Sequence, residues 1–159
     1  MNSEGCYMTT KILGKLNPSS YSPLPYYIEK VPAGFPSPAS GYIEASIDLN
    51  ELCISHPNAT FLVRASGISM IDAGIYPEDL LVVDRSLEAQ QCDIIVCAVN
   101  GEFTVKELCL EPTPKLVAYN DDFEDIPLSD DIDFEVFGVV KNIIREVKRG
   151  RGQQRRFNF

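Results

Sequence analysis

Two residues could together cut a peptide bond: Ser69, in the run Ser-Gly-Ile-Ser-Met at 66–70, and Lys106, at the end of Gly-Glu-Phe-Thr-Val-Lys at 101–106. A hydroxyl group is a weak nucleophile until a neighbouring base takes its proton, and a neutral lysine amine can be that base. The ordinary pKa of lysine is about 10.4, so the amine is neutral near pH 7 only where burial disfavours its charged form. This chemistry therefore requires Lys106 to lie among apolar neighbours.

The residues around Lys106 predict a β-hairpin. Two β-rich runs, 93–99 and 102–108, are separated by Asn100-Gly101, which is the strongest short signal for a hairpin turn. The resulting register pairs Val99 with Glu102, Cys97 with Thr104 and Ile95 with Lys106. This register places the Lys106 amine beside apolar side chains. The alternative is an exposed edge-strand lysine, which is the commoner use of lysine in strands and which the hairpin alone does not exclude.

The residues around Ser69 predict a corner between a strand and a short helical turn. Residues 60–65 have the pattern of a strand, Ser66-Gly67 that of a turn, and 70–74 that of one helical turn ending at glycine. Backbone N–H groups at the start of a helical turn have no hydrogen-bond partner within the turn. Those of Ile68 and Ser69 could therefore hold a developing oxyanion. The alternative is that Ser69 only caps the turn.

A bond upstream, Ala33–Gly34, is a possible substrate of this pair. The residues on both sides of the bond are small, which suits a narrow cleft, and Pro32 and Pro36 restrict the backbone to extended shapes. Taken alone, the segment is equally an ordinary proline-flanked linker.

Four motifs in this order resemble the UmuD-like SOS mutagenesis proteins of the LexA-like self-cleaving peptidase family. The motifs are Ala-Gly-Phe-Pro-Ser-Pro-Ala at 33–39, Ser-Gly-Ile-Ser-Met-Ile-Asp at 66–72, Asp-Leu-Leu-Val-Val-Asp at 79–84 and Gly-Glu-Phe-Thr-Val-Lys at 101–106. The resemblance covers about residues 31–147. It implies that Ser69 attacks the carbonyl of Ala33, that Lys106 acts as general base and then as general acid, and that Gly34 becomes a new amino terminus.

The resemblance also implies partners. It predicts a homodimer whose cleavage is stimulated by the RecA filament on single-stranded DNA. The cleaved product would join an UmuC-like Y-family polymerase in translesion DNA synthesis. Because RecA would favour the conformation in which the arm enters the cleft, the chain needs no sequence-specific DNA-reading motif of its own.

The predicted fold is mostly β, a LexA/UmuD-like peptidase fold with an extended N-terminal arm. We expect strands at 60–65, 79–84, 93–99, 102–110, 115–119 and 134–144, and a short helix within 47–54 that Asp48 could cap. The predicted domains are an arm at 1–33 that cleavage removes, a peptidase and dimerisation domain at 34–147, and a basic tail at 148–159. Composition favours a solvated end for this tail over a contact with DNA or an acidic partner.

Composition narrows the class of protein. The 159 residues carry a net charge of −9, which argues against a broad phosphate-binding surface. The cysteines number five and His56 is the only histidine, so we expect no disulfide framework, no metal, no cofactor and no Ser-His-Asp site. The sequence has no secretory leader and no apolar run of about 18 residues, which predicts a cytoplasmic bacterial protein without a membrane span and separates it from signal peptidases, which also use Ser and Lys.

Two alternatives differ in class from a self-cleaving polymerase subunit. A LexA-type repressor would carry a DNA-binding domain before the cleaved bond, but the 33 residues there are too few and too rich in proline for a helix-turn-helix domain. A non-enzymatic relative would keep the fold for protein contacts alone. The joint presence of Ser69, Lys106 and Ala33–Gly34 argues against the second alternative.

Overall fold

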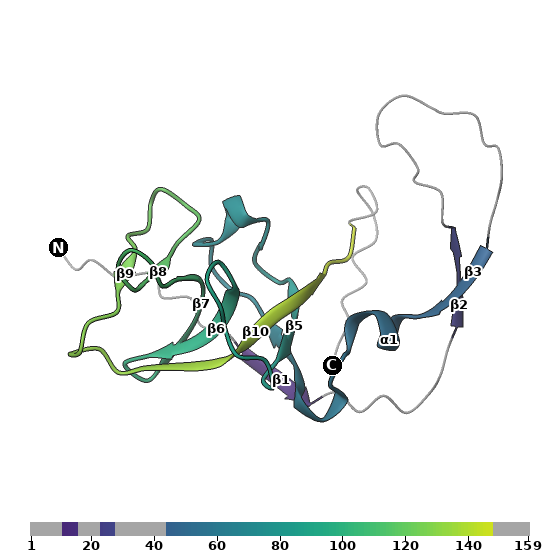
Figure 1. The fold of residues 1–159 in the computed structure, drawn as a ribbon. Helices are drawn as coiled ribbons and strands as arrows, with labels where there is room; N and C mark the ends of the chain where they lie inside the picture. Colours follow the sequence, from purple (N-terminus) through teal and green to yellow (C-terminus); the bar gives the residue numbers. More distant parts are fainter. Residues whose placement is uncertain (1–10, 16–22, 28–43, 148–159) are drawn as a thin grey trace.

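Eight antiparallel strands form one sheet in a computed structural model, which describes residues 11–15, 23–27 and 44–147 (Figure 1). Its strands are β1 (Lys11–Lys15), β4 (Thr60–Arg64), β5 (Leu80–Asp84), β6 (Ile94–Val99), β7 (Glu102–Cys109), β8 (Lys115–Val117), β9 (Ile126–Pro127) and β10 (Phe134–Ile144). Their spatial order is β1-β4-β5-β10-β6-β7-β8-β9. The Ala33–Gly34 bond and the tail at 148–159 lie outside the described residues.

A second, two-stranded sheet pairs β2 (Pro23–Tyr27) with β3 (Glu44–Asp48), and Figure 1 draws it apart from the main sheet, beyond α1. The helical elements are short: α1 (Leu49–Cys53), η1 (Pro57–Ala59) and η2 (Ile71–Ala73). Helix α1 begins as predicted, because the Asp48 side chain accepts a hydrogen bond from the Asn50 N–H at 2.7 Å.

The central strands are apolar on both faces, and the two faces bury different residues. One cluster contains Val63, Val83, Val96 and Val105, and the Ser69 loop packs Met70 and Ile75 into it. The other cluster contains Ile95, Cys97, Leu108, Leu116 and Val139. Because successive side chains of a strand point to opposite faces, neighbouring positions such as 95 and 96 belong to different clusters.

The mostly β fold class is confirmed, and every strand predicted from residue 60 onward is present. Strands β1, β2, β3 and β9 were not predicted from the sequence. The two described parts of the predicted arm, 11–15 and 23–27, are strands: β2 pairs with β3, and β1 pairs with β4 at the edge of the main sheet. Prolines at 23 and 25 hide β2 from the sequence pattern, since proline cannot donate to a sheet ladder and occurs in strands only at edges.

The close approach of β10 to its paired strand β5 can be tested at Gly138. A Cβ atom at this buried position would lie 2.8 Å from both the Asp84 carbonyl oxygen and the Val83 Cγ1 atom. We expect Gly138→Ala to lower the free energy of unfolding by about 1–3 kcal/mol, because the added methyl group overpacks the sheet. Urea denaturation measures the change, and the exposed Glu135→Ala in the same strand is the control. Equal midpoints for the two variants would contradict the expectation.

Candidate functional site

The hairpin that carries Lys106 has the predicted register. Strands β6 and β7 pair Val99 with Glu102, Cys97 with Thr104 and Ile95 with Lys106. The turn residues Asn100 and Gly101 both have positive φ, at 51° and 83°. This backbone matches the right-handed twist of the flanking strands, which is why Asn-Gly marks such turns.

Lys106 is buried, with 5% of its surface exposed. Its cross-strand partner Ile95 and the diagonal neighbour Cys97 both belong to one core cluster. Burial lowers the pKa of Lys106 from its ordinary value, and the nearby Cys97 partly opposes this effect. Burial raises the pKa of the Cys97 thiol to about 12, so this thiol is neutral at physiological pH.

The amine of Lys106 contacts three oxygen atoms. Its Nζ lies 2.8 Å from Ser69 Oγ, 3.1 Å from Thr104 Oγ1 and 3.1 Å from the Val105 carbonyl oxygen. A neutral amine has two N–H groups and one lone pair. In this neutral form, donation to Thr104 and Val105 would leave the lone pair available to accept the Ser69 O–H.

Ser69 lies between β4 and η2 and is buried, with 1% exposed. The predicted helical turn is the short η2, which ends at Gly74 with φ 83°. The Met70 carbonyl accepts hydrogen bonds from the N–H groups of Ala73 and Ile75, and the side chains of Met70 and Ile75 are fully buried. Met70, the residue after Ser69, is therefore fixed in the core.

Residues 119–120, just after β8, hold the backbone of the Ser69 loop. The Tyr119 N–H donates to the Ser69 carbonyl at 2.8 Å, and the Tyr119 carbonyl accepts from the Asp72 N–H at 3.0 Å. The Asn120 side chain donates to the Ile68 carbonyl at 3.0 Å. Neither Tyr119 nor Asn120 was a candidate from the sequence, since no local motif marks them. The predicted oxyanion role of the Ile68 and Ser69 N–H groups stays a prediction.

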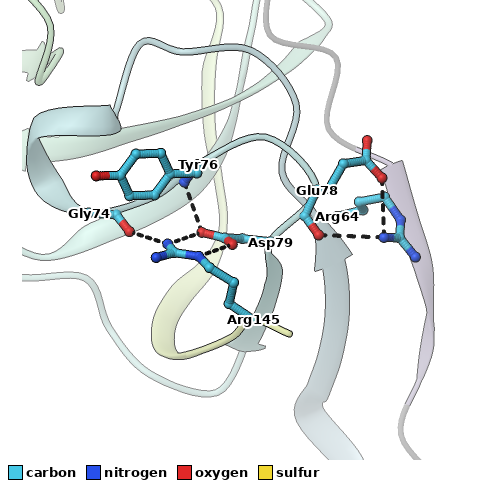
Figure 2. A network of polar contacts seen from close by, with 6 residues as sticks. All are labelled: Arg64, Gly74, Tyr76, Glu78, Asp79 and Arg145. Carbon is cyan, nitrogen blue, oxygen red and sulfur yellow. Dashed lines mark hydrogen bonds and ion pairs between the residues drawn. The ribbon is translucent and has the colours of Figure 1, made fainter. Parts of the chain in front are cut away.

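The far end of the same loop is tied to the end of β10 by Arg145 (Figure 2). The Arg145 guanidinium donates to both carboxylate oxygens of Asp79, at 2.6 and 2.5 Å, and to the Gly74 carbonyl at 2.6 Å. It also lies 4.4 Å from the ring centroid of Tyr76, whose backbone N–H donates to Asp79. Asp79 is 2% exposed, so this arginine is the counter-ion of a buried carboxylate.

The other candidate residues lie away from the Ser69–Lys106 contact or outside the described residues. His56 pairs with Asp84 through its Nδ1 at 2.6 Å, and Asp84 also accepts from Ser86. Within residues 11–15, 23–27 and 44–147, no group of three or more His, Cys, Asp or Glu side chains has the arrangement of a metal site. No helix in these ranges has both the length and the apolar character that a membrane span requires. The structure places Ser69 and Lys106 together but does not describe Ala33 or Gly34.

Comparison with known proteins gives one family and several relatives. The family model described as Peptidase S24-like matches residues 25–141. Protein MucA of Salmonella typhimurium is 44% identical over 124 residues, which cover 77% of this chain and 85% of MucA. Protein ImpA of Escherichia coli is 46% identical over 135 residues, or 80% of this chain and 87% of ImpA. The LexA repressor of Pseudomonas chlororaphis is 36% identical over 120 residues, 74% of this chain and 59% of the repressor.

The Asp79–Arg145 pair makes stability depend on pH. Burial alone would raise the pKa of Asp79, but hydrogen bonds from Arg145 and the Tyr76 N–H outweigh it, so the pKa lies below 3.8. Its contribution is therefore present above about pH 3.8 and is lost as the pH falls through the lower folded-state value. We expect Asp79→Asn to lower the melting temperature at neutral pH and to have a smaller effect in acid.

Calorimetry at pH 7 and near pH 3 measures this difference. Glu78→Gln is the matched control, because Glu78 is 78% exposed and its contact with Arg64 is long, at 3.4 Å. An equal loss of stability for Asp79→Asn at both pH values would contradict the assignment.

Proposed function

The chain belongs to the Peptidase S24-like family, a family of serine peptidases, and we propose that it cuts its own Ala33–Gly34 bond, with Ser69 as nucleophile and Lys106 as general base. The predicted resemblance to UmuD-like proteins is confirmed by the family match and by the MucA and ImpA relatives. The observation that carries the proposal is the 2.8 Å contact between Lys106 Nζ and Ser69 Oγ in a buried setting.

The proposed reaction has two steps. Ser69 Oγ attacks the carbonyl carbon of Ala33 and passes its proton to Lys106 Nζ, which then gives a proton to the departing amine of Gly34. An ester between Ser69 and Ala33 remains. Water attacks this ester and gives a proton to Lys106, which passes it to the departing Ser69 Oγ; the Ala33 carboxylic acid then releases its remaining proton to solvent. The N–H groups of Ile68 and Ser69 are the proposed donors to the oxyanion of each step.

Burial of Lys106 supports its role as base in this reaction. An ammonium group in the same place could only donate hydrogen bonds, and it could not take the Ser69 proton. Thr104 and the Val105 carbonyl accept from the amine and fix its direction. These two acceptors orient the lone pair toward Ser69.

The proposal extends to regulation and partners. The RecA filament on single-stranded DNA would stimulate cleavage, and the homodimeric product would serve an UmuC-like Y-family polymerase in translesion synthesis during the SOS response. Similarity to UmuD-like relatives over most of the chain supports this extension. The match to a LexA repressor covers 59% of that protein.

Loss of either member of the pair should abolish cleavage. We expect wild-type protein incubated with RecA, ATP and single-stranded DNA to give a fragment that begins at Gly34. Ser69→Ala and Lys106→Ala should give none, because each lacks one partner of the proton transfer. Mass spectrometry identifies the fragment, and Ser129→Ala, at an exposed serine before β10, is the control. A Gly34 fragment from purified Ser69→Ala would overturn the assignment, and cleavage independent of RecA at neutral pH would contradict the regulatory part.

Alkaline pH should promote cleavage without RecA. Only the neutral amine can accept the Ser69 proton, so the rate should rise about tenfold per pH unit until it levels off near the pKa of Lys106. Because that pKa is lowered, we expect half of the plateau rate at a pH below 10.5. Lys106→Arg keeps the positive charge but cannot deprotonate, and it should stay uncut throughout. A wild-type rate that does not change with pH would contradict lysine as the base.

A further inference from the structure

Residues 119–120 lie between the two elements that meet at the site. The Tyr119 N–H donates to the Ser69 carbonyl at 2.8 Å, and Asn120 Nδ2 donates to the Ile68 carbonyl at 3.0 Å. On the other side, the Tyr119 hydroxyl donates to Glu107 Oε2 at 2.7 Å. Glu107 follows Lys106 directly in β7. One short segment thus touches both the nucleophile loop and the strand that carries the lysine.

The two carbonyls that this segment holds belong to the peptide groups on either side of the Ser69 Cα atom. Each peptide group is planar, so a hydrogen bond to its carbonyl oxygen restricts how the whole group can turn. Together the two hydrogen bonds restrict the φ and ψ angles of Ser69 and therefore the direction of its Cβ atom. The same geometry points the Ser69 N–H away from Asn120, because N–H and C=O are opposed in a trans peptide group.

We propose that Asn120 is a positioning residue: its amide holds the Ile68–Ser69 peptide group and thereby aims the Ser69 hydroxyl at Lys106. This inference rests on the proposed function of the Ser69–Lys106 pair. Reactive groups must be aligned closely, and a misplacement of about 1 Å can cost about 100-fold in rate. Asn120 does not touch the reacting atoms and acts through the Ile68 carbonyl.

Asparagine suits this position because both ends of its amide are used. Nδ2 donates to Ile68, while Oδ1 accepts from the Asp122 N–H at 3.0 Å and so shapes the turn that presents the side chain. Asn120→Asp keeps that acceptor and loses the donor. Asn120→Ala loses both without adding a charge. The pair of variants therefore separates the turn from the contact with Ile68.

The test measures cleavage without RecA across alkaline pH for Asn120→Ala and Asn120→Asp. We expect the plateau rate to fall about 10- to 100-fold in both variants. For Asn120→Ala the pH of half-maximal rate should not move, since the burial of Lys106 is unchanged. Asp121→Ala, an exposed neighbour in the same turn, should cleave at the wild-type rate.

A second readout does not depend on the arm. A small fluorophosphonate reacts with an activated serine, and its rate of labelling at Ser69, followed by mass spectrometry, should fall in parallel with cleavage. Wild-type rates of labelling and cleavage in both variants would overturn the inference. So would a loss that melting curves explain fully by unfolding in both variants.

The experiments distinguish a failure of the proposed function from a failure of this inference. If wild-type protein is not cut, or if Ser69→Ala is cut, the Ser69–Lys106 assignment itself is wrong. If wild-type cleavage depends on Ser69 and the Asn120 variants keep the wild-type rate, only the positioning role of Asn120 is wrong.

Discussion

The burial of one amine constrains the whole site. Lys106 has lost nearly all contact with water, and a charged ammonium group in such a place is costly unless its charge is compensated. Among the described residues, its Nζ forms hydrogen bonds with two hydroxyl oxygens and one carbonyl oxygen, and with no carboxylate. The surroundings therefore favour the neutral form, which is the form that can take a proton. In the proposed reaction, Ile95 and Cys97 would contribute by helping to bury the amine, although neither would carry out a step.

The Ser69 loop is held at both ends by long-range polar contacts. Near Ser69, the segment at 119–120 holds two consecutive carbonyls. At the far end, Arg145 joins Asp79 and Gly74 to the last strand of the sheet. The buried side chains of Met70 and Ile75 fix the middle. These contacts restrict the Ser69 loop, and in the proposed reaction such restriction would lower the entropic cost of aligning the Ser69 hydroxyl.

The sequence predicted the parts of the site that depend on local patterns. The Asn-Gly turn set the register of β6 and β7, and the register alone placed Lys106 beside Ile95. The Asp48 cap is local in the same sense. By contrast, Asn120 meets Ile68 across 52 residues and Arg145 meets Asp79 across 66, and no periodicity or turn signal relates positions so far apart. The pairing of β1 with β4 was hidden for the same reason, and β9 has only two residues.

Because β1 and β2 are paired with later strands, cleavage of the Ala33–Gly34 bond and release of the preceding piece would be separate events. Strands β1 and β2 precede the Ala33–Gly34 bond, while their partners β4 and β3 follow it. If that bond is cut as proposed, the covalent link is lost, but the hydrogen bonds of these two ladders do not include the cut bond. A nicked molecule would therefore remain a complex of two pieces, and release of the shorter piece would be a dissociation with its own rate.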